Sequence, residues 1–336
     1  MRDQMRAGSS LKFGIVGLGY FGKHYPRLLK EFEGVTLVAV ASRTRDAFER
    51  LGELLPSAVE RHTDARKVFM HPEVDCVIIA TPPSLHFGMA KTALGAGKHV
   101  LIEKPMTTSL KEARALEAAV AKSGRVFMVG HQYLYNDYIR TLKEKLNAGL
   151  IGPVRYLFAE HTYLGPIRAD IGCFWETATH ELAIIDYLFS PGKLAAVEGQ
   201  SGGVADREDY AVASLKFESG LEAVIFVSWF LPEKVRRMMF AGSGGSALFD
   251  DRALDQKLKF VIRPYPESVP AGAYSQFLDA KDTEVLTPAV AASEPLKNQL
   301  AHFIESVRTG SAPLTDIAHG LRVTELLDTV SQRIAA

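Results

Sequence analysis

The chain has 336 residues, enough for two domains of ordinary size, and its 47% hydrophobic and 23% charged residues are the balance of a globular protein. Lysine plus arginine equal aspartate plus glutamate at 39 each, so the net charge is zero, without the basic excess that nucleic-acid binding through phosphates normally needs. The N-terminus is polar and no run approaches the ~20 apolar residues of a membrane span, so we expect a soluble protein without a secretory signal.

Short apolar runs alternate with helical patterns in the first part of the chain. The apolar runs predict strands over 12–17, 36–41, 76–80, 99–102 and 126–130. Apolar residues at helical spacing predict helices over 22–33, 45–55, 84–96 and 109–122. This alternation is typical of parallel strands joined by right-handed crossovers, with helices on both faces of the sheet. We therefore expect a doubly wound parallel sheet in a dinucleotide-binding Rossmann domain over 11–130.

The pattern changes after about residue 147. Strands are predicted over 154–163, 194–202, 210–217, 221–230, 234–241 and 258–263, and helices over 177–188, 295–308 and 317–334. Turn signals such as Glu218-Ser-Gly220 make most connections too short for crossover helices, so this sheet should be open and mostly antiparallel. We expect an α+β domain over 131–336, with the closing helices able to pack back on the first domain. The segment 265–290 is predicted to be a long surface excursion.

A glycine-rich loop follows the first predicted strand. In Gly14-Ile-Val-Gly17-Leu-Gly19-Tyr-Phe-Gly22, Gly17 permits a tight turn, Gly19 lets the backbone approach a pyrophosphate, and Gly22 allows close helix packing. The motif leads from a strand into a helix, which is the context that a dinucleotide site requires. We expect these glycines, with Tyr20 and Phe21, to bind NADP or NAD.

The end of the second strand bears on the choice of cofactor. NAD-binding domains usually place an acidic residue there, whereas this chain has Ser42-Arg43-Thr44, and Asp46 already belongs to the next helix. A hydroxyl followed by a guanidinium suits a 2′-phosphate, so we expect NADP to be preferred over NAD. The alternative is that Ser42 or Thr44 caps the helix and Arg43 is solvated.

Two further loops follow parallel strands and should lie at the same edge of the sheet. The first, Ala80-Thr-Pro-Pro-Ser-Leu-His86, contributes Thr81, Pro82 and His86 as candidate cofactor contacts. The second, Ile102-Glu103-Lys104-Pro105, places a lysine at the end of an apolar strand, where partial desolvation lowers its pKa and eases proton exchange. Glu103 and Lys104 are both predicted to lie against the cofactor.

These motifs, in this order and spacing, resemble the Gfo/Idh/MocA family of oxidoreductases (glucose–fructose oxidoreductase, inositol dehydrogenase and relatives). The resemblance covers the whole chain, and Glu103-Lys104-Pro105 is its most specific element. It implies a Rossmann domain followed by a domain with an open sheet, which supplies the substrate site and often supports oligomer contacts. The closing pattern from Pro295 to Asp316 is similar to the nucleotide-sugar dehydrogenase branch, which typically uses NAD.

The resemblance also implies catalytic residues in the second domain. The family carries an acidic residue four positions before a histidine, and Glu176 and His180 occupy those positions; four residues apart, they would share one face of a helix. The acid is usually Asp, as is the residue after the histidine, where Glu181 stands. His180 is the expected general acid or base, Lys104 the stabiliser of charge on the same oxygen, and Glu176 an orienting residue.

Other residues have predicted places near the nicotinamide. Gln132 and Tyr133 follow the fifth strand, and Trp175 packs either against the cofactor or in the domain interface. The substrate is expected to be a sugar, polyol or nucleotide sugar. If the substrate carries a phosphate or carboxylate, we expect a cationic side chain to bind that group. The candidates are Arg168, Arg236 and Arg237.

Two other function classes remain open from the sequence. The same fold could reduce a non-sugar carbonyl or oxidise a dihydrodiol, and a Rossmann module can act as a sensor without turnover, although a sensor would be expected to lack Lys104 or His180. Cys76 and Cys173 are far apart and no histidines have metal-ligand spacing, so we expect no metal site and a cytoplasmic location. The predicted partners are a small sugar-like substrate and further copies of the chain in a homo-oligomer, with no nucleic acid and no membrane.

Overall fold

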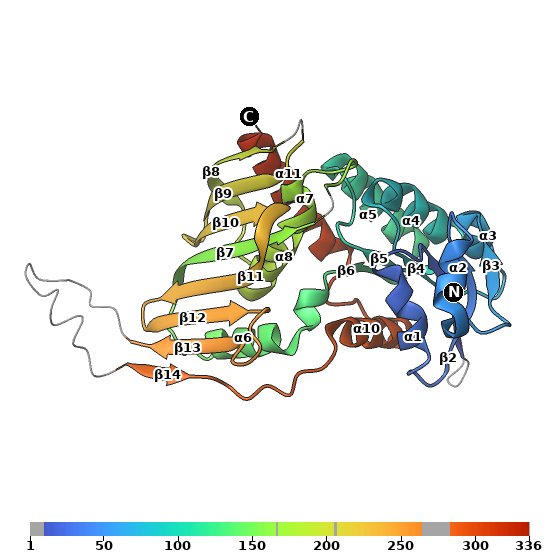
Figure 1. Cartoon of the computed structure of the whole chain (residues 1–336), viewed down its shortest axis with the longest axis horizontal. Coiled ribbons are helices and arrows are strands. Elements are labelled where there is room, and N and C mark those ends of the chain that lie inside the picture. The colour runs from blue at the N-terminus through green and yellow to red at the C-terminus, as the bar shows by residue number, and fades with distance from the viewer. Residues whose placement is uncertain (1–9, 166, 205–206, 264–282, 336) are drawn as a thin grey trace, which may run out of the picture. The chain divides into compact units, whose positions relative to one another are not determined.

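The computed structural model describes residues 10–165, 167–204, 207–263 and 283–335 (Figure 1). The chain divides into two compact units. Unit 1 contains residues 1–132 and 294–325, and unit 2 contains residues 133–293 and 326–336. The segment 294–325, which we counted in the second domain while expecting its helices to be able to pack back on the first, belongs to unit 1. Part of the predicted excursion over 265–290 lies outside the described residues.

Unit 1 is built on a parallel sheet whose described strands number six. In order across the sheet they are β3 (Glu60–His62), β2 (Val35–Ala41), β1 (Leu11–Val16), β4 (Cys76–Ile79), β5 (His99–Glu103) and β6 (Phe127–Gly130). All neighbouring pairs are parallel, as predicted. The short strand β3 was not predicted, because its residues are polar and two of the three are exposed.

Helices cover both faces of this sheet. They are η1 (Gly22–His24), α1 (Tyr25–Leu29), α2 (Asp46–Leu51), η2 (Gly52–Leu54), α3 (Ala65–Phe69), η3 (Pro83–Leu85), α4 (His86–Gly95), α5 (Leu110–Ser123), α10 (Pro295–Thr309) and the first turns of α11 (Ile317–Ile334). One face packs Val77 and Ile79 with α3, α4 and α5. On the other face, Phe13 meets Phe303 of α10 edge to face at 6.1 Å. The predicted burial of both faces is confirmed.

Local signals explain where helix α5 begins and ends. Ser109 accepts a hydrogen bond from the Glu112 amide at 3.3 Å, and Glu112 accepts one from the Thr108 amide at 3.3 Å. The two residues reciprocally satisfy amides that a helix start leaves unpaired. Gly124 then ends the helix in the left-handed region at φ +62°, which a glycine adopts without strain.

Unit 2 contains a second sheet, mostly antiparallel as predicted. Its described strands, in order across the sheet, are β14 (Glu284–Leu286), β13 (Leu258–Ile262), β12 (Gly245–Asp250), β11 (Phe230–Gly242), β7 (Val154–Leu164), β10 (Glu222–Ser228), β9 (Tyr210–Phe217) and β8 (Leu194–Gly202). Only β7 and β10 are paired in parallel among these. Strands β12 and β14 were not predicted from the sequence.

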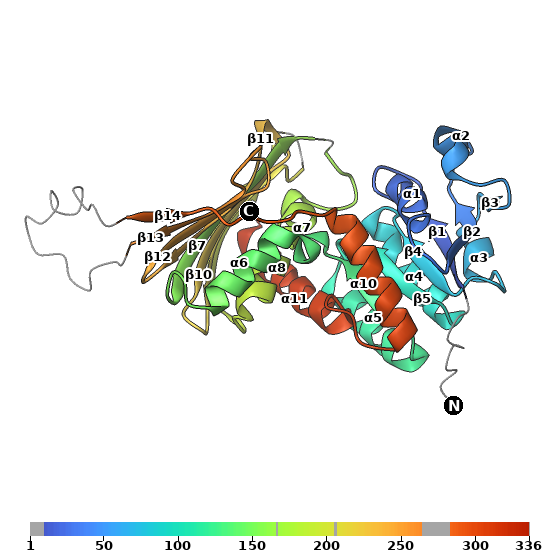
Figure 2. The same cartoon turned by 90° about the horizontal axis from the view of Figure 1, so that it is seen from below.

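The helices of unit 2 gather along one face of this sheet, as Figure 2 shows for α6, α7 and α8. They are α6 (Asp137–Asn147), α7 (Cys173–Thr177), α8 (Thr179–Phe189) and the last turns of α11, with the one-turn helix η4 (Gln132–Tyr135) before them. Alternate residues of β9, from Ala211 to Phe217, point into the buried face. The opposite face of the sheet carries no described helix of this unit.

Candidate functional site

The glycine loop lies at the point where the strand order of the parallel sheet reverses. Strand β1 has β2 on one side and β4 on the other, and ligands of such sheets bind beyond the carboxyl ends of the strands at this point. The loop follows β1, and Thr81 and Pro82 follow β4. Gly17 has φ +93°, and a Cβ on it would lie 2.4 Å from the carbonyl oxygen of Ala80. Only glycine lets the two loops approach so closely.

The other two glycines of the motif have different surroundings. A Cβ on Gly22 would lie 1.9 Å from the carbonyl oxygen of Gly17, so Gly22 is needed for packing within the loop. A Cβ on Gly19 would meet no described atom within 4 Å. The backbone at Gly19 is therefore open to an approaching ligand, which fits a pyrophosphate. Tyr20 is exposed and packs edge to face with Phe21 at 5.7 Å.

The residues that follow β2 are Ser42, Arg43 and Thr44, and the guanidinium of Arg43 lies at the surface. The Ser42 amide donates to the carbonyl of His62 at 3.0 Å, which fixes the backbone, and Arg43 is exposed. Helix α2 has Arg45 as its N-cap, without a side-chain cap, so neither Ser42 nor Thr44 caps it. A hydrogen bond from Thr44, together with Arg50, lowers the pKa of Asp46. The acid nearest to Arg43 in the sequence is thus occupied by other groups.

A buried histidine joins the two loops that follow β4 and β5. The ring of His86 has Nδ1 at 2.8 Å from the carbonyl oxygen of Pro105 and Nε2 at 2.9 Å from that of Thr81. The side chain is fully buried. His86 therefore supports the backbone of both loops, and its direct contact with a cofactor stays a prediction.

The Glu103-Lys104 pair stands at the carboxyl end of β5. Glu103 is buried and accepts a hydrogen bond from the Tyr25 hydroxyl at 2.6 Å, and Gln299 of α10 donates to the same hydroxyl oxygen at 3.3 Å. Burial raises the pKa of Glu103, while the bond from Tyr25 and the charge of Lys104 oppose that shift. This buried anchor fixes the backbone from which the half-buried Lys104 side chain leaves.

The helix predicted over 177–188 is α8, which begins two residues later than expected, and the short helix α7 precedes it. Glu176 belongs to α7 and His180 to the first turn of α8, so they do not share one continuous helix as we expected. Both nevertheless approach the same strand, because Glu176 accepts from the Tyr163 hydroxyl at 3.4 Å and the ring of His180 stacks on His161 at 5.8 Å. His161 and Tyr163 are two apart on β7 and point to one face of the sheet.

Aromatic rings surround His180 in this unit. Tyr133 meets it edge to face at 5.1 Å, and His180 is only 6% exposed. Burial raises the pKa of Tyr133 and of Tyr163, so both phenols stay protonated well above neutral pH, and each donates a hydrogen bond to a carboxylate. Trp175 is half-buried, and so is Gln132 in unit 1. His180 is thus a buried imidazole beside that of His161 in a partly polar setting, and an imidazole can hold or release one proton.

Sequence reasoning missed the partner of Glu181. Its Oε1 lies 2.9 Å from Nδ1 of His161, and both side chains are buried. The alternation of Leu157, Ala159 and His161 along β7 was an available signal, because it places the histidine on the inward face. No pattern in the sequence joins that strand to α8.

The three candidate arginines are each next to a carboxylate. Arg168 binds both oxygens of Asp170 at 3.0 Å, and Arg237 lies 2.7 Å from Glu160. Arg236 donates to the Tyr133 hydroxyl at 3.0 Å and has Asp251 at 3.9 Å. Their positive charges are thus already balanced within unit 2, which weakens the prediction that they bind an anionic substrate group.

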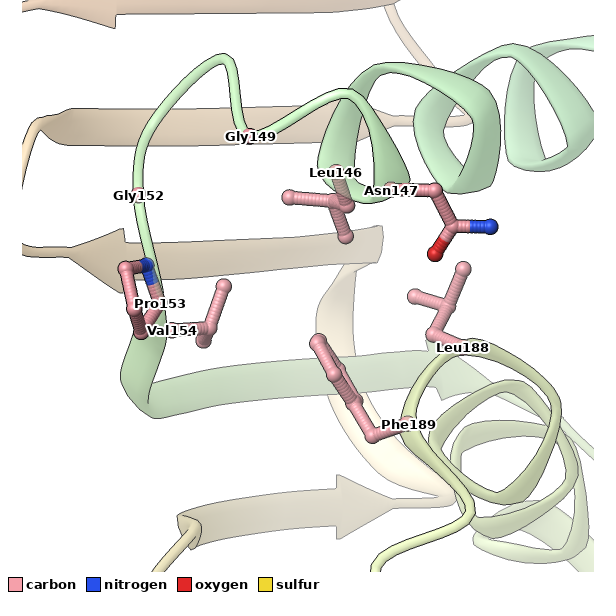
Figure 3. A pocket seen from close by; sticks show the side chains of 8 residues that line it. All are labelled: Leu146, Asn147, Gly149, Gly152, Pro153, Val154, Leu188 and Phe189. Atoms are coloured by element: carbon pink, nitrogen blue, oxygen red, sulfur yellow. The ribbon is translucent and has the colours of Figure 1, made fainter.

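A surface groove of about 290 Å³ lies beside the C-terminal end of α8 (Figure 3). His180 lies at the other end of this helix. Leu188 and Phe189 line the groove together with the end of α6 and the start of β7. None of the predicted site residues lines this groove.

In the described part of the chain, no helix has both the length and the apolar character of a membrane span.

Both units match models of one protein family. The model described as "Oxidoreductase family, NAD-binding Rossmann fold" matches residues 11–131, and "GFO/IDH/MocA C-terminal domain" matches residues 139–248. These two segments are the parallel-sheet domain and much of the antiparallel one.

Individual relatives agree with this match. The chain is 30% identical to 1-carboxy-3-chloro-3,4-dihydroxycyclohexa-1,5-diene dehydrogenase of Comamonas testosteroni over 66% of its length, but that alignment spans only 58% of the relative. It is also 30% identical to UDP-N-acetylglucosamine 3-dehydrogenase of Acidithiobacillus ferrooxidans (strain ATCC 23270), over 68% of this chain and 70% of that protein.

A solved structure covers nearly the whole chain. It comes from Magnetospirillum magnetotacticum MS-1, is named as an oxidoreductase, and is 30% identical with a TM-score of 0.79 over 95% of this chain and 99% of that one. From the two domain matches and these relatives, the chain belongs to the Gfo/Idh/MocA family of NAD(P)-dependent oxidoreductases.

Proposed function

We propose that the chain transfers a hydride between NAD(P) and a secondary alcohol or ketone carbon of a sugar, polyol or nucleotide sugar, with Lys104 and His180 acting on the same oxygen. The observation that carries this proposal is that buried groups position both residues. Lys104 leaves a backbone anchored through Glu103, and His180 is packed between aromatic rings.

Each residue has a separate role in the proposed reaction. NAD(P), when bound, supplies or accepts the hydride. His180 takes the hydroxyl proton at its imidazole during oxidation and returns it during reduction. Lys104 donates a hydrogen bond to the same oxygen and stabilises the negative charge that develops there. Glu176, held by Tyr163 and Thr177, orients the substrate or His180.

The cofactor residues follow from the parallel sheet alone. Gly17, Gly19 and Gly22 form the cradle for the pyrophosphate, with Thr81 and Pro82 on the neighbouring loop. We further propose that NADP is preferred over NAD. An exposed guanidinium at Arg43, beside the hydroxyl of Ser42, suits a 2′-phosphate.

A second substrate class has a specific observation in its favour. The relative from Comamonas testosteroni is named as a dehydrogenase of a chlorinated, carboxylated dihydroxycyclohexadiene, a non-sugar diol. Tyr133 contacts His180, Tyr163 contacts Glu176, and Trp175 lies five residues before His180 in the sequence. Aromatic rings such as these could pack against a cyclic diene. A sensor without turnover is less well supported, because both reactive residues are present.

We also propose a homo-oligomer formed through the uncovered face of the antiparallel sheet. Strand pairing places four apolar residues in one row across this face: Val224, Phe158, Met239 and Leu248. Met239 is 39% exposed. Cross-strand ion pairs such as Arg237–Glu160 stand beside the row. An apolar band with a charged margin is the pattern of an interface between copies.

The experiment is a nicotinamide absorbance screen of polyols, aldoses, nucleotide sugars and cyclic dihydrodiols with both cofactors. On the substrate found, Lys104→Ala and His180→Ala should each lower turnover by about 10²–10⁴-fold while NAD(P)H binding is kept. The exposed Lys122→Ala, at the end of α5, is the matched control and should behave as wild type. Wild-type turnover in either active-site variant would refute the proposed chemistry.

A further inference from the structure

A buried histidine–glutamate pair lies directly against His180. The pair consists of Glu181 on α8 and His161 on β7, joined by the 2.9 Å contact between Oε1 and Nδ1. The rings of His161 and His180 are stacked, with centroids 5.8 Å apart and planes 27° from parallel. The pair is distinct from Glu176, whose carboxylate is held by Tyr163 and Thr177.

The contact fixes how the His161 ring is oriented. A carboxylate can only accept at Nδ1, so the proton of the ring is held there. The Nε2 atom is buried and has no hydrogen-bond partner among the described residues. Glu181 is therefore the group that decides the orientation and proton position of His161.

The length of the Glu181 side chain matters for this contact. Aspartate is shorter by one methylene, or about 1.5 Å, and from the same backbone position it would not reach Nδ1 at hydrogen-bond distance. The pair thus depends on a glutamate at position 181. Glu181 is 6% exposed and His161 is 2% exposed, so solvent screens their charges little.

Several charged groups surround the two histidines within unit 2. Negative charge comes from Glu181 on α8, Glu176 on α7 and Asp251 after β12. Positive charge comes from Arg236 on β11, which lines one small cavity with Glu181, and from Lys257, 3.8 Å from Asp251. Tyr133 and Tyr163 contribute neutral phenols. Removing the charge of Glu181 therefore makes the net charge around the two histidines more positive. A more positive surrounding destabilises the protonated form of His180.

We propose that Glu181 and His161 are positioning residues for His180: the carboxylate orients the His161 ring, and the pair favours the protonated form of the imidazole stacked on it. This inference rests on the proposed function for its catalytic meaning. The protonated imidazole is the form that His180 reaches after taking the substrate proton, so the pair stabilises the state that hydride transfer from an alcohol creates.

The test is a pH titration of the His180 ring in the whole protein. The chemical shift of its Cε1–H signal, measured by NMR at each pH, gives the midpoint. Glu181→Gln keeps the size and the acceptor oxygen but removes the charge. Its His180 midpoint should fall by about one pH unit. In the pH–rate profile the His180 limb should move in the same direction, and kcat should fall about ten-fold with KM changed less than two-fold. Glu144→Gln, an exposed glutamate on α6, is the matched control and should change neither.

Two more variants cover the remaining outcomes. Glu181→Asp keeps the charge but loses the contact, and a midpoint between those of wild type and Glu181→Gln is expected. His161→Gln keeps a donor for Glu181 but removes the ring stacked on His180, so its kcat should fall with little change in KM. This kcat readout replaces that of Glu181→Gln if Glu181→Gln does not fold. A wild-type midpoint and kcat in the folded variants would overturn the inference. If His180→Ala keeps full turnover, the proposed function fails instead, and the NMR titration still decides the positioning role.

Discussion

At the scale of single residues, we propose that Arg43 makes the protein bind NADP more tightly than NAD. Its guanidinium is exposed, whereas Arg50 on the same surface is paired with Asp46. Arg43→Ala should weaken NADP binding by about 10–100-fold, the worth of a charge-assisted hydrogen bond, and leave NAD binding nearly unchanged. Fluorescence titration with both cofactors measures this, and Arg50→Ala is the control. Equal losses for NADP and NAD would show that Arg43 does not bind the 2′-phosphate.

Because of His99, at the start of β5, we expect the free energy of unfolding to fall at acid pH. Burial lowers the pKa of His99 to about 4, and its Nδ1 accepts a hydrogen bond from the Val126 amide at 3.0 Å. The unfolded chain, with a histidine pKa of about 6.5, binds the proton more readily between those values. The free energy of unfolding should therefore be unaffected above about pH 6.5 and fall by about 2–3 kcal/mol as the pH drops toward 4.

Urea unfolding at pH 7 and pH 5 checks this contribution. His99→Asn keeps an acceptor near the Val126 amide but does not titrate, so its stability should depend less on pH over this range than that of the wild type. The same pH dependence in both proteins would assign the acid sensitivity to other groups.

Single residues were predictable from the sequence where a local motif defines them. The glycines of the loop and Lys104 after its strand are of this kind, since strand ends and turns set their positions. The pair between Glu181 and His161 was not predictable, because it joins a helix to a strand 20 positions earlier. The support that His86 gives to two loop carbonyls also depends on tertiary packing.

At the scale of elements, the glycine loop separates a ligand role from a packing role. Gly19→Ala places a methyl group in open space, so the melting temperature should stay within a few degrees while NAD(P)H affinity falls at least ten-fold. Gly22→Ala forces a Cβ to 1.9 Å from a carbonyl oxygen and should lower the melting temperature clearly. Thermal unfolding and cofactor titration of the two variants test this, and the reverse pattern would contradict it.

Predicted elements agree with the structure where the apolar pattern is strong. Strands β8 and β9 and helix α11 have the predicted bounds. Strand β12 was missed because the Gly242-Ser-Gly-Gly245 turn leads directly into it, and the run after the turn is short. Helix α6 was missed because it is mostly polar, with only Ile139 and Leu142 buried; its cap, Asn136, was the available signal.

At the scale of the whole molecule, the order of residues along the chain differs from their grouping in space. Helix α10 follows the antiparallel sheet in sequence yet belongs to unit 1, where Gln299 reaches Tyr25 and Phe303 packs on Phe13. The sequence left open whether the closing helices pack on the first domain, because an amphipathic helix does not specify which apolar face covers it.

A substitution that introduces a charge on the uncovered face of the antiparallel sheet tests the proposed homo-oligomer. Met239→Asp, in the centre of the apolar row, should convert the assembly to monomers because an unpaired carboxylate would be buried at the interface. Sedimentation velocity gives the masses. Arg252→Ala, exposed after β12, is the control and should leave the assembly intact. A monomeric wild type, or an unchanged mass for Met239→Asp, would remove this surface from the proposal.

The central claim, that Lys104 and His180 act on one substrate oxygen, is tested most directly by a double-mutant cycle. Single-turnover hydride transfer is measured for Lys104→Met, His180→Gln and the double variant at saturating cofactor and substrate. If the two side chains serve the same oxygen, the double variant should be little slower than the slower single variant, because residues that act as a unit are not additive. Losses that multiply would place the two residues at independent steps and contradict the proposed site.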